Sequence, residues 1–382
     1  DVHHTPVFLA YMLLTKTEAV LCVQEKILSA EIRDKLKKAG VSTLPYEQIE
    51  ELVCGLQTGQ KLWVDGRRVN YRLLQMDAPS PVERMKAVKT AAEMEHLRKA
   101  HVKDGVAVSR FMRYLKTHVG KERITELGAA QVLDGFRQQM EGYLGPSFDP
   151  IIAYGAHGAI VHYAATKESD VEMKPEGLCL ADTGGHYKDG TTDITRTIAL
   201  GELSAQEKRD YTLVLKGHLR LGAAKFLEGV CGQNLDCLAR EPLWENGLDY
   251  NHGTGHGVGF LLSVHEGPQN FRWRIGKDAD CVPLEEGMVI SNEPGLYVTG
   301  KFGIRHENLV LCRKGEQNDF GQFMYLETLT MAPFDKDAIE VTLLNSQERD
   351  WLNGYHKKVY ETLSPYMTKE EQEWLQKATA AV

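Results

Sequence analysis

The stretch LADTGGHYKDGTTD, residues 180–193, decides the fold and introduces the chemistry of this chain. Two aspartates, Asp182 and Asp193, flank a run of glycine, lysine and aspartate that is typical of a turn. If a hairpin is centred between Tyr187 and Lys188, the two aspartates lie opposite each other, with Cβ atoms about 5 Å apart. Like charges at this spacing are destabilising unless a positive group neutralises them. The stretch therefore predicts a hairpin whose acidic pair needs a counter-charge.

A second acidic pair occurs in SNEPGLYVTGKFGIRHEN, residues 291–308. Glu293 and Glu307 are equally far from Gly300, so a hairpin centred there places two more carboxylates across from each other. Strand alternation puts Arg305 on the same face as Glu307 and His306 on the opposite face. We therefore expect Arg305 beside the acidic pair and His306 away from it.

A loop rich in glycine and histidine, NHGTGHGVG at residues 251–259, lies between the two pairs. Its alternating glycines let the backbone approach a bound group closely. The spacing differs from that of the dinucleotide fingerprint and of the phosphate-binding loop. The loop presents His252 and His256, and His265 follows a few residues later.

Four carboxylates and a histidine in one dry site raise the pKa values of the acids through repulsion and burial. Two divalent cations remove this cost, because their four positive charges equal the four carboxylate charges. Oxygen-rich ligation with one imidazole suits Mn²⁺ best, with Zn²⁺, Co²⁺ or Fe²⁺ as alternatives. Two metals about 3.5–4 Å apart can share a water and polarise a carbonyl. The residues themselves therefore predict a two-metal hydrolase.

Composition narrows the class of protein further. The chain has 382 residues, 42% of them hydrophobic and 26% charged, as in an ordinary globular protein. The net charge of −8 disfavours nucleic acid as a partner. The longest apolar stretch, residues 6–14, is far shorter than the roughly 20 residues of a membrane span, so no membrane partner is expected. The seven cysteines contain no C-x-x-C pair, which predicts free thiols in a reducing, cytoplasmic compartment.

The chain divides into two expected domains at the proline-rich break DAPSP, residues 77–81. Residues 1–79 are expected to form a small α/β unit. Residues 80–382 alternate helices and strands, with possible capping boxes beginning at Ser80, Thr90, Ser204 and Thr368. Strands are expected at residues 151–154, 160–163, 178–182, 192–200, 288–293, 302–312 and 326–331.

At these motifs the chain resembles the Xaa-Pro aminopeptidases (aminopeptidase P), and among them the cytosolic three-domain type, of the pita-bread metallopeptidases. The strongest stretches are residues 181–197, 252–259, 265–268 and 292–308. The resemblance implies an α+β fold, in which a pita-bread catalytic domain at residues 80–382 follows a smaller α/β creatinase N-terminal-like domain at residues 1–79. Three-domain relatives carry another α/β domain, which the resemblance would place ahead of residue 1.

The resemblance also implies a role for each matched position. The metal ligands would be Asp182, Asp193, His256, Glu293 and Glu307, with Asp193 and Glu307 bridging two ions. The catalytic residues would be His162, His265 and Glu293, and the substrate-binding residues His162, His252, His265 and Arg305. His306 stands where the family commonly has an apolar residue, and alternation argues against its being a ligand.

The activity implied is release of the N-terminal residue from peptides with proline in second position, by attack of a hydroxide that bridges two Mn²⁺ ions. A homodimer in the cytoplasm is implied as well. Two alternatives stay open. One is a prolidase that takes only Xaa-Pro dipeptides. The other is a non-catalytic binding protein with this fold, which the retention of all five ligands disfavours, as it disfavours a metal-free creatinase.

Overall fold

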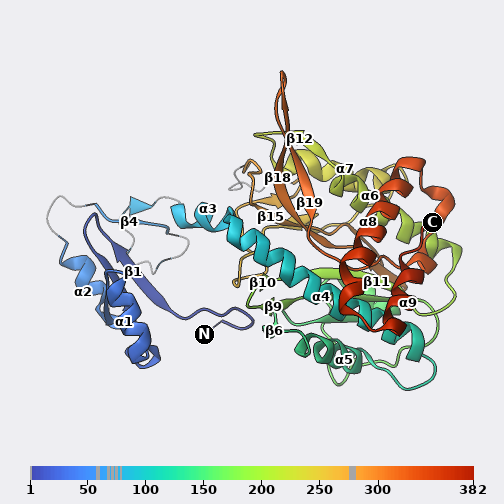
Figure 1. The fold of residues 1–382 in the computed structure, drawn as a ribbon, viewed down its shortest axis with the longest axis horizontal. Helices are drawn as coiled ribbons and strands as arrows, with labels where there is room; N and C mark the ends of the chain where they lie inside the picture. Colours follow the sequence, from blue (N-terminus) through green and yellow to red (C-terminus); the bar gives the residue numbers. More distant parts are fainter. Residues whose placement is uncertain are drawn as a thin grey trace. The chain divides into compact units, whose positions relative to one another are not determined.

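The chain forms two compact units, Asp1–Arg84 and Met85–Val382, in the computed structural model of Figure 1. The structure describes residues 2–56, 61–66, 69, 73, 76–77, 80–274 and 281–382. The sequence placed the domain boundary between residues 79 and 80, and residues 78 and 79 of the proline-rich break lie outside the described residues.

The first unit is a small α/β unit, as the sequence predicts. Its sheet has the order β1-β2-β3, with β1 antiparallel and β3 parallel to β2. Helix α1 connects the two parallel strands, as a parallel crossover requires. Val20, Cys22, Ile49 and Val53 form the buried core. The elements of this unit are β1 (Ala10–Leu14), β2 (Ala19–Val23), α1 (Ala30–Lys38), β3 (Val41–Pro45), α2 (Ile49–Cys54), β4 (Trp63–Val64) and β5 (Met76–Asp77); helix α3 (Pro81–Ala87) runs across the division.

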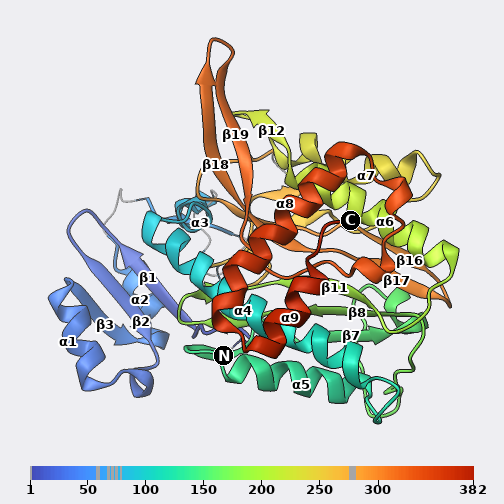
Figure 2. The same cartoon turned by 45° about the vertical axis from the view of Figure 1, so that its right-hand side comes forward.

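The second unit surrounds its strands with helices, and α4, α8 and α9 lie in front of them in Figure 2. Three of the expected capping boxes are formed, at Thr90, Ser204 and Thr368. No helix among the described residues is long and apolar enough to cross a membrane. The helices are α4 (Ala91–His118), α5 (Glu126–Gln138), α6 (Ala205–Gly222), α7 (Gly232–Trp244), α8 (Ser346–Leu363) and α9 (Lys369–Ala378).

The strands of this unit form small sheets rather than one large one. Their orders are β10-β9-β6, β11-β8-β7, β12-β19-β18-β15, β13-β14 and β16-β17. The strands are β6 (Tyr143–Pro146), β7 (Ile151–Tyr154), β8 (Leu178–Thr183), β9 (Gly185–Tyr187), β10 (Gly190–Thr191), β11 (Ile194–Ala199), β12 (Lys225–Leu227), β13 (Gly255–His256), β14 (Asn270–Phe271), β15 (Val289–Asn292), β16 (Gly295–Val298), β17 (Phe302–Arg305), β18 (Asn308–Asn318) and β19 (Gly321–Thr328).

Apolar side chains join these sheets to the helices. One cluster packs Phe111 and Leu115 of α4 against Ile198 of β11. Another packs Leu235 of α7 against Ile290 of β15. Both β11 and β15 adjoin residues predicted to form the site, so the core holds these site-bearing strands between helices.

The predicted strand at residues 160–163 is wrong. A 3₁₀ helix, Gly155–Ala159, precedes this stretch, which forms a bend and a turn. The helix packs closely on β17, because a Cβ atom placed on Gly303 would lie 1.6 Å from the carbonyl oxygen of Gly158. His162 consequently lies on an exposed turn instead of a strand.

The prediction of free thiols is wrong for two cysteines, since Cys231 and Cys281 form a disulfide with Cα atoms 5.8 Å apart. The two residues are 50 positions apart in the chain. A β-bridge between Cys231 and Pro283 brings them together. This contact depends on the tertiary fold, which is why the cysteine spacing did not indicate it. The other five cysteines are free.

Candidate metal centre

The five proposed ligands lie at the ends of strands that come from different parts of the second unit. Asp182 lies within β8, and Asp193 directly precedes β11. Glu293 follows β15, and Glu307 lies between β17 and β18. His256 lies on β13, whose neighbour Gly257 forms a bridge with Ile290 of β15.

The hairpin register of the first acidic pair differs from the prediction. Asp182 pairs with Thr195, and Gly190 pairs with Tyr187, so the turn is centred between Lys188 and Asp189. The turn therefore lies one residue later than the sequence predicts. Gly190 has φ +134°, a conformation that favours glycine, and this places the strand reversal. Asp193 is therefore two residues from the position opposite Asp182 rather than directly across from it.

The register of the second acidic pair is as predicted. Asn292 pairs with Asn308 on one side of the pair, and Gly295 pairs with Arg305 on the other. These two pairings share the centre at Gly300, where φ is +73°. Glu293 and Glu307 therefore lie opposite each other between two short ladders.

Three of the four carboxylates, those of Asp193, Glu293 and Glu307, converge with the imidazole of His256. The Nε2 atom of His256 lies 3.6 Å from Asp193 Oδ2 and 3.4 Å from Glu293 Oε1. One ligand atom each from Asp193, His256 and Glu307 lies within 4.8 Å of the others. Residues more than 100 positions apart thus present an imidazole nitrogen and carboxylate oxygens to a shared space.

Burial and mutual repulsion shift the pKa values of Asp193, Glu293 and Glu307 upward. Burial, followed by the charges of Asp182 and Glu293, holds the pKa of Asp193 well above its ordinary value. Burial and the charge of Asp193 do the same to Glu307. Burial raises the pKa of Glu293 to about 7. Burial also lowers the pKa of His256, so its imidazole is neutral and able to act as a ligand.

A chain of hydrogen bonds runs along one side of the site. Arg305 Nη2 donates to Asp182 Oδ2 at 2.5 Å, and Arg305 Nη1 donates to the hydroxyl of Tyr297 at 2.7 Å. The same hydroxyl lies 2.8 Å from His252 Nε2. Arg305 and His252, both predicted from the sequence, are therefore joined through Tyr297, which sequence reasoning missed. Tyr297 lies on β16 opposite Gly303 of β17, and this place in the predicted hairpin is the signal that could have indicated it.

Two hydroxyl groups that sequence reasoning also missed hold the carboxylates. Thr195 Oγ1 donates to Glu307 Oε2 at 2.6 Å. Ser291 Oγ donates to Glu293 Oε1 at 3.1 Å and accepts a hydrogen bond from the backbone N–H of His256. Such contacts orient ligands, and their loss commonly weakens metal binding.

The remaining predicted histidines border this centre. The rings of His265 and His256 have centroids 4.2 Å apart. His162 is exposed, and its charge contributes to lowering the pKa values of His252 and His265. All of the predicted site residues are therefore associated with one region.

His306 lies on the other side of the strand, as alternation predicted. Its Nε2 atom lies 3.3 Å from the carbonyl oxygen of Tyr211, and its ring packs edge-on against that of Tyr211. It borders the fully buried Arg196, whose Nη1 donates to the backbone carbonyls of Thr195 and Glu307. This neighbourhood supports the backbone behind the site.

The donor set suits divalent cations. Asp182 Oδ1 is buried and has no hydrogen-bond partner among the described residues, although burying a carboxylate oxygen in this way is costly. Burial, and after it the charges of neighbouring acids, raises the pKa values of Asp193 and Glu307, and a bound cation would offset both effects. Carboxylate oxygens with one neutral imidazole are ligands that Mn²⁺ and similar ions accept.

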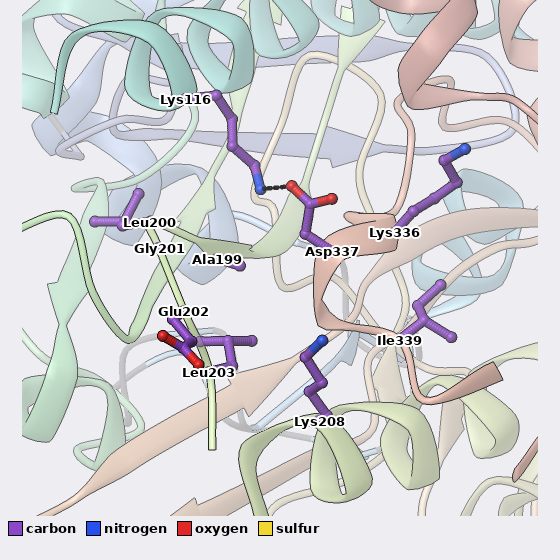
Figure 3. A pocket seen from close by; sticks show the side chains of 10 residues that line it. All are labelled: Lys116, Ala199, Leu200, Gly201, Glu202, Leu203, Lys208, Lys336, Asp337 and Ile339. Atoms are coloured by element: carbon purple, nitrogen blue, oxygen red, sulfur yellow. Dashed lines mark hydrogen bonds and ion pairs between the residues drawn. The ribbon is translucent and has the colours of Figure 1, made fainter. Parts of the chain in front are cut away.

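A separate cavity of about 480 Å³ contains none of the predicted site residues (Figure 3). Three lysines line it, but two are already engaged. Lys116 contacts Asp335 and Asp337 at 2.6 and 2.7 Å, and Lys336 donates to the carbonyl of Ala380. The cavity therefore does not offer a group of unpaired cations to a ligand. The buried acids remain the better candidate site.

Models of known protein families match nearly the whole chain. The model for metallopeptidase family M24 matches residues 95–314, and the model for the C-terminal region of that peptidase family matches residues 322–382. The model for the creatinase/prolidase N-terminal domain matches residues 1–93.

Individual proteins are similar over the full chain. Aminopeptidase P2 of Arabidopsis thaliana is 39% identical over 98% of this chain, which spans 58% of that protein. A probable Xaa-Pro aminopeptidase P of Laccaria bicolor is 38% identical over 99% of the chain, which spans 61% of that protein. The chain therefore covers about three fifths of the length of these relatives.

Solved structures share the architecture. The X-prolyl aminopeptidase of Caenorhabditis elegans, described as a cytosolic enzyme with a di-nuclear active site, superimposes with a TM-score of 0.94 at 32% identity. That match covers 100% of this chain and 65% of the other. An Xaa-Pro dipeptidase from Bacillus anthracis gives a TM-score of 0.69 at 25% identity, over 86% of this chain and 89% of that one.

Proposed function

Because the chain belongs to metallopeptidase family M24 and has its pita-bread fold, we propose that it is a metal-dependent aminopeptidase releasing the N-terminal residue from peptides with proline second. The observation that carries this proposal is the convergence of Asp193, Glu307 and His256 beside Glu293. The names of the relatives, which include aminopeptidase P, support the choice of substrate. We assign the peptidase to residues 80–382 and regard residues 1–79 as its preceding domain.

We assign the metal ligands as the sequence resemblance implies. Asp182, Asp193, His256, Glu293 and Glu307 would hold two divalent cations, with Asp193 and Glu307 shared between them. When bound, such ions lower the pKa of a water and polarise a substrate carbonyl. Mn²⁺ is the proposed ion because the donors are mainly carboxylate oxygens.

The protein's own groups would bind substrate and move protons. Glu293 is the proposed proton carrier, because its carboxylate lies among the proposed ligands, 3.4 Å from His256 Nε2, where it can accept a proton from an attacking water and pass it on. His265 and His162 would donate hydrogen bonds to the carbonyl oxygen under attack. His252, fixed by Tyr297, would contact the proline ring, and Arg305 would hold Asp182 in place.

Prolidase activity is the alternative function, and the observation in its favour is that an Xaa-Pro dipeptidase has the same fold. The peptides Arg-Pro-Pro and Arg-Pro distinguish the two enzymes. We expect the purified protein to release arginine from Arg-Pro-Pro after chelation and addition of Mn²⁺, Zn²⁺ or Co²⁺ in turn. Cleavage of Arg-Pro alone would identify a prolidase.

The Asp193→Ala variant provides the control for this assay. We expect it to lose metal binding and activity together, because a bridging carboxylate is removed. If the unmodified chain bound no metal and cleaved neither peptide, the non-catalytic binding protein would become the better interpretation.

We also propose a homodimer in the cytoplasm, the arrangement that the sequence resemblance implies. The C. elegans relative is described as cytosolic. The Cys231–Cys281 disulfide is unusual for that compartment. Sedimentation velocity tests the oligomer, and fractionation of cells followed by mass spectrometry of this cysteine pair tests the location.

A further inference from the structure

Arg272 carries a positive charge to the edge of the metal centre. It directly follows β14, which pairs with β13 so that Asn270 lies opposite His256 and Phe271 opposite Gly255. Side chains alternate along a strand, so Asn270 and Arg272 share the side of the ladder on which His256 lies.

The guanidinium of Arg272 lies against a glycine of the histidine loop. A Cβ atom placed on Gly253 would lie 3.0 Å from Arg272 Nε and 3.4 Å from Nη2. The absence of a side chain at Gly253 therefore leaves the space that the guanidinium occupies. Gly253 is bonded to His252, so Arg272 borders the residue proposed to contact the substrate proline.

Arg272 has no hydrogen bond or ion pair within the described part of the chain, and its side chain is exposed. The neighbouring cations differ from it in this respect. Arg305 is bound to Asp182, and Arg274 stacks on the ring of Trp273 with its guanidinium carbon 4.8 Å from the centroid. Arg272 is thus a guanidinium available to an incoming group, and a guanidinium binds carboxylates with two parallel hydrogen bonds.

We propose that Arg272 binds a carboxylate on the third residue of the substrate, and so determines which Xaa-Pro peptides the enzyme prefers. This inference rests on the proposed peptidase function and on the proposed place of His252. Two residues of extended peptide beyond the scissile carbonyl span about 7 Å. Asn270, opposite His256, and Arg272 are two strand positions apart, which is also about 7 Å. The carboxylate can be the C-terminus of a tripeptide or an acidic side chain.

Three substrates distinguish the sources of this carboxylate: Arg-Pro-Ala, its C-terminal amide, and Arg-Pro-Asp amide. We expect the unmodified enzyme to cleave the free acid with a kcat/KM about tenfold above that of the alanine amide, mainly through KM. The aspartate amide recovers this advantage if the side chain serves, and it fails to recover it if the site binds only the C-terminus.

Arg272→Gln should remove the preference for the free acid, Arg272→Lys should restore part of it, and Arg274→Gln should keep it as the matched control. A preference that persists in Arg272→Gln, or that the unmodified enzyme lacks, overturns the proposal. An enzyme that cleaves none of the three peptides contradicts the proposed function instead. Equal metal content in all variants, measured by elemental analysis, shows that the metal centre is intact.

Discussion

Single residues beside the proposed ligands should determine how firmly a metal is held at the candidate centre. Thr195 is the clearest example, because its hydroxyl donates to Glu307 at 2.6 Å within the core. We expect Thr195→Val to weaken metal binding by about 10- to 100-fold, as loss of a ligand-orienting hydrogen bond commonly does. Thr195→Ser, which keeps the hydroxyl, should retain most of the affinity. Calorimetric titration of both variants with Mn²⁺ measures the difference, and equal affinities would contradict the role assigned to this hydrogen bond.

The protonation of Glu293 should couple metal binding to pH. Its pKa of about 7 lies above its ordinary value, so the metal-free carboxyl carries a proton below pH 7 and is ionised above it. A cation displaces that proton, and affinity should therefore fall as the pH falls through 7. Calorimetry at pH 6 and pH 8, in buffers with different ionisation enthalpies, counts the protons released. We expect more protons at pH 6, where Glu293→Gln should release fewer than the unmodified chain.

Sequence patterns predicted the residues of the candidate centre but not the residues that hold them in place. Asp182 and Asp193 were recognisable because they flank a run of turn residues, and Glu293 and Glu307 because they recur symmetrically about Gly300. Thr195 and Tyr297 were missed because threonine and tyrosine are common in strands, and their partners lie on other segments.

At the scale of elements, close contacts between backbones position the histidine loop. A Cβ atom on Gly255 would lie 1.8 Å from the carbonyl oxygen of Ser291, so β13 can approach β15 only with glycine there. We expect Gly255→Ala to displace β13, carrying His256 away from Asp193 and lowering both metal affinity and melting temperature.

A glycine in an open position provides the control for this prediction. Gly354 lies inside α8, and a Cβ atom there would meet nothing within 4 Å. Gly354→Ala should stabilise the protein by about 0.5–1 kcal/mol, because alanine loses less backbone entropy in a helix. The melting temperatures of the two variants should therefore change in opposite directions, and only Gly255→Ala should lower metal affinity. Unchanged metal affinity in Gly255→Ala would contradict the packing argument.

The hairpins show how far local sequence reaches at this scale. The second hairpin was predicted in register because Gly300 lies at its centre. The predicted centre of the first hairpin was wrong by one residue, because several residues between Gly184 and Gly190 favour a turn. Strand β6 pairs with β9, and the sequence of the hairpin alone does not indicate this contact.

At the scale of the whole molecule, bound metal should stabilise the fold. The metal-free centre keeps several acids together in a buried site, and cations that bind only the folded chain add free energy through mass action. Free metal at 100 times its dissociation constant contributes about 2.7 kcal/mol. We expect chelation to lower the melting temperature by several degrees and Mn²⁺ to restore it. Asp193→Ala should show no such response, and a melting temperature insensitive to chelator would contradict a structural contribution of the metals.

The sequence by itself determined the α+β class, and it predicted the acids and histidines of the candidate site and the need for positive charge among them. These features follow from local rules: strand alternation, turn chemistry and the repulsion of like charges. Only the tertiary structure decided that Tyr297 joins Arg305 to His252, that Cys231 pairs with Cys281, and that Arg272 lies against Gly253. Each of these contacts joins different elements of the fold. Their geometry depends on how strands and loops pack, and no periodicity within one segment encodes it.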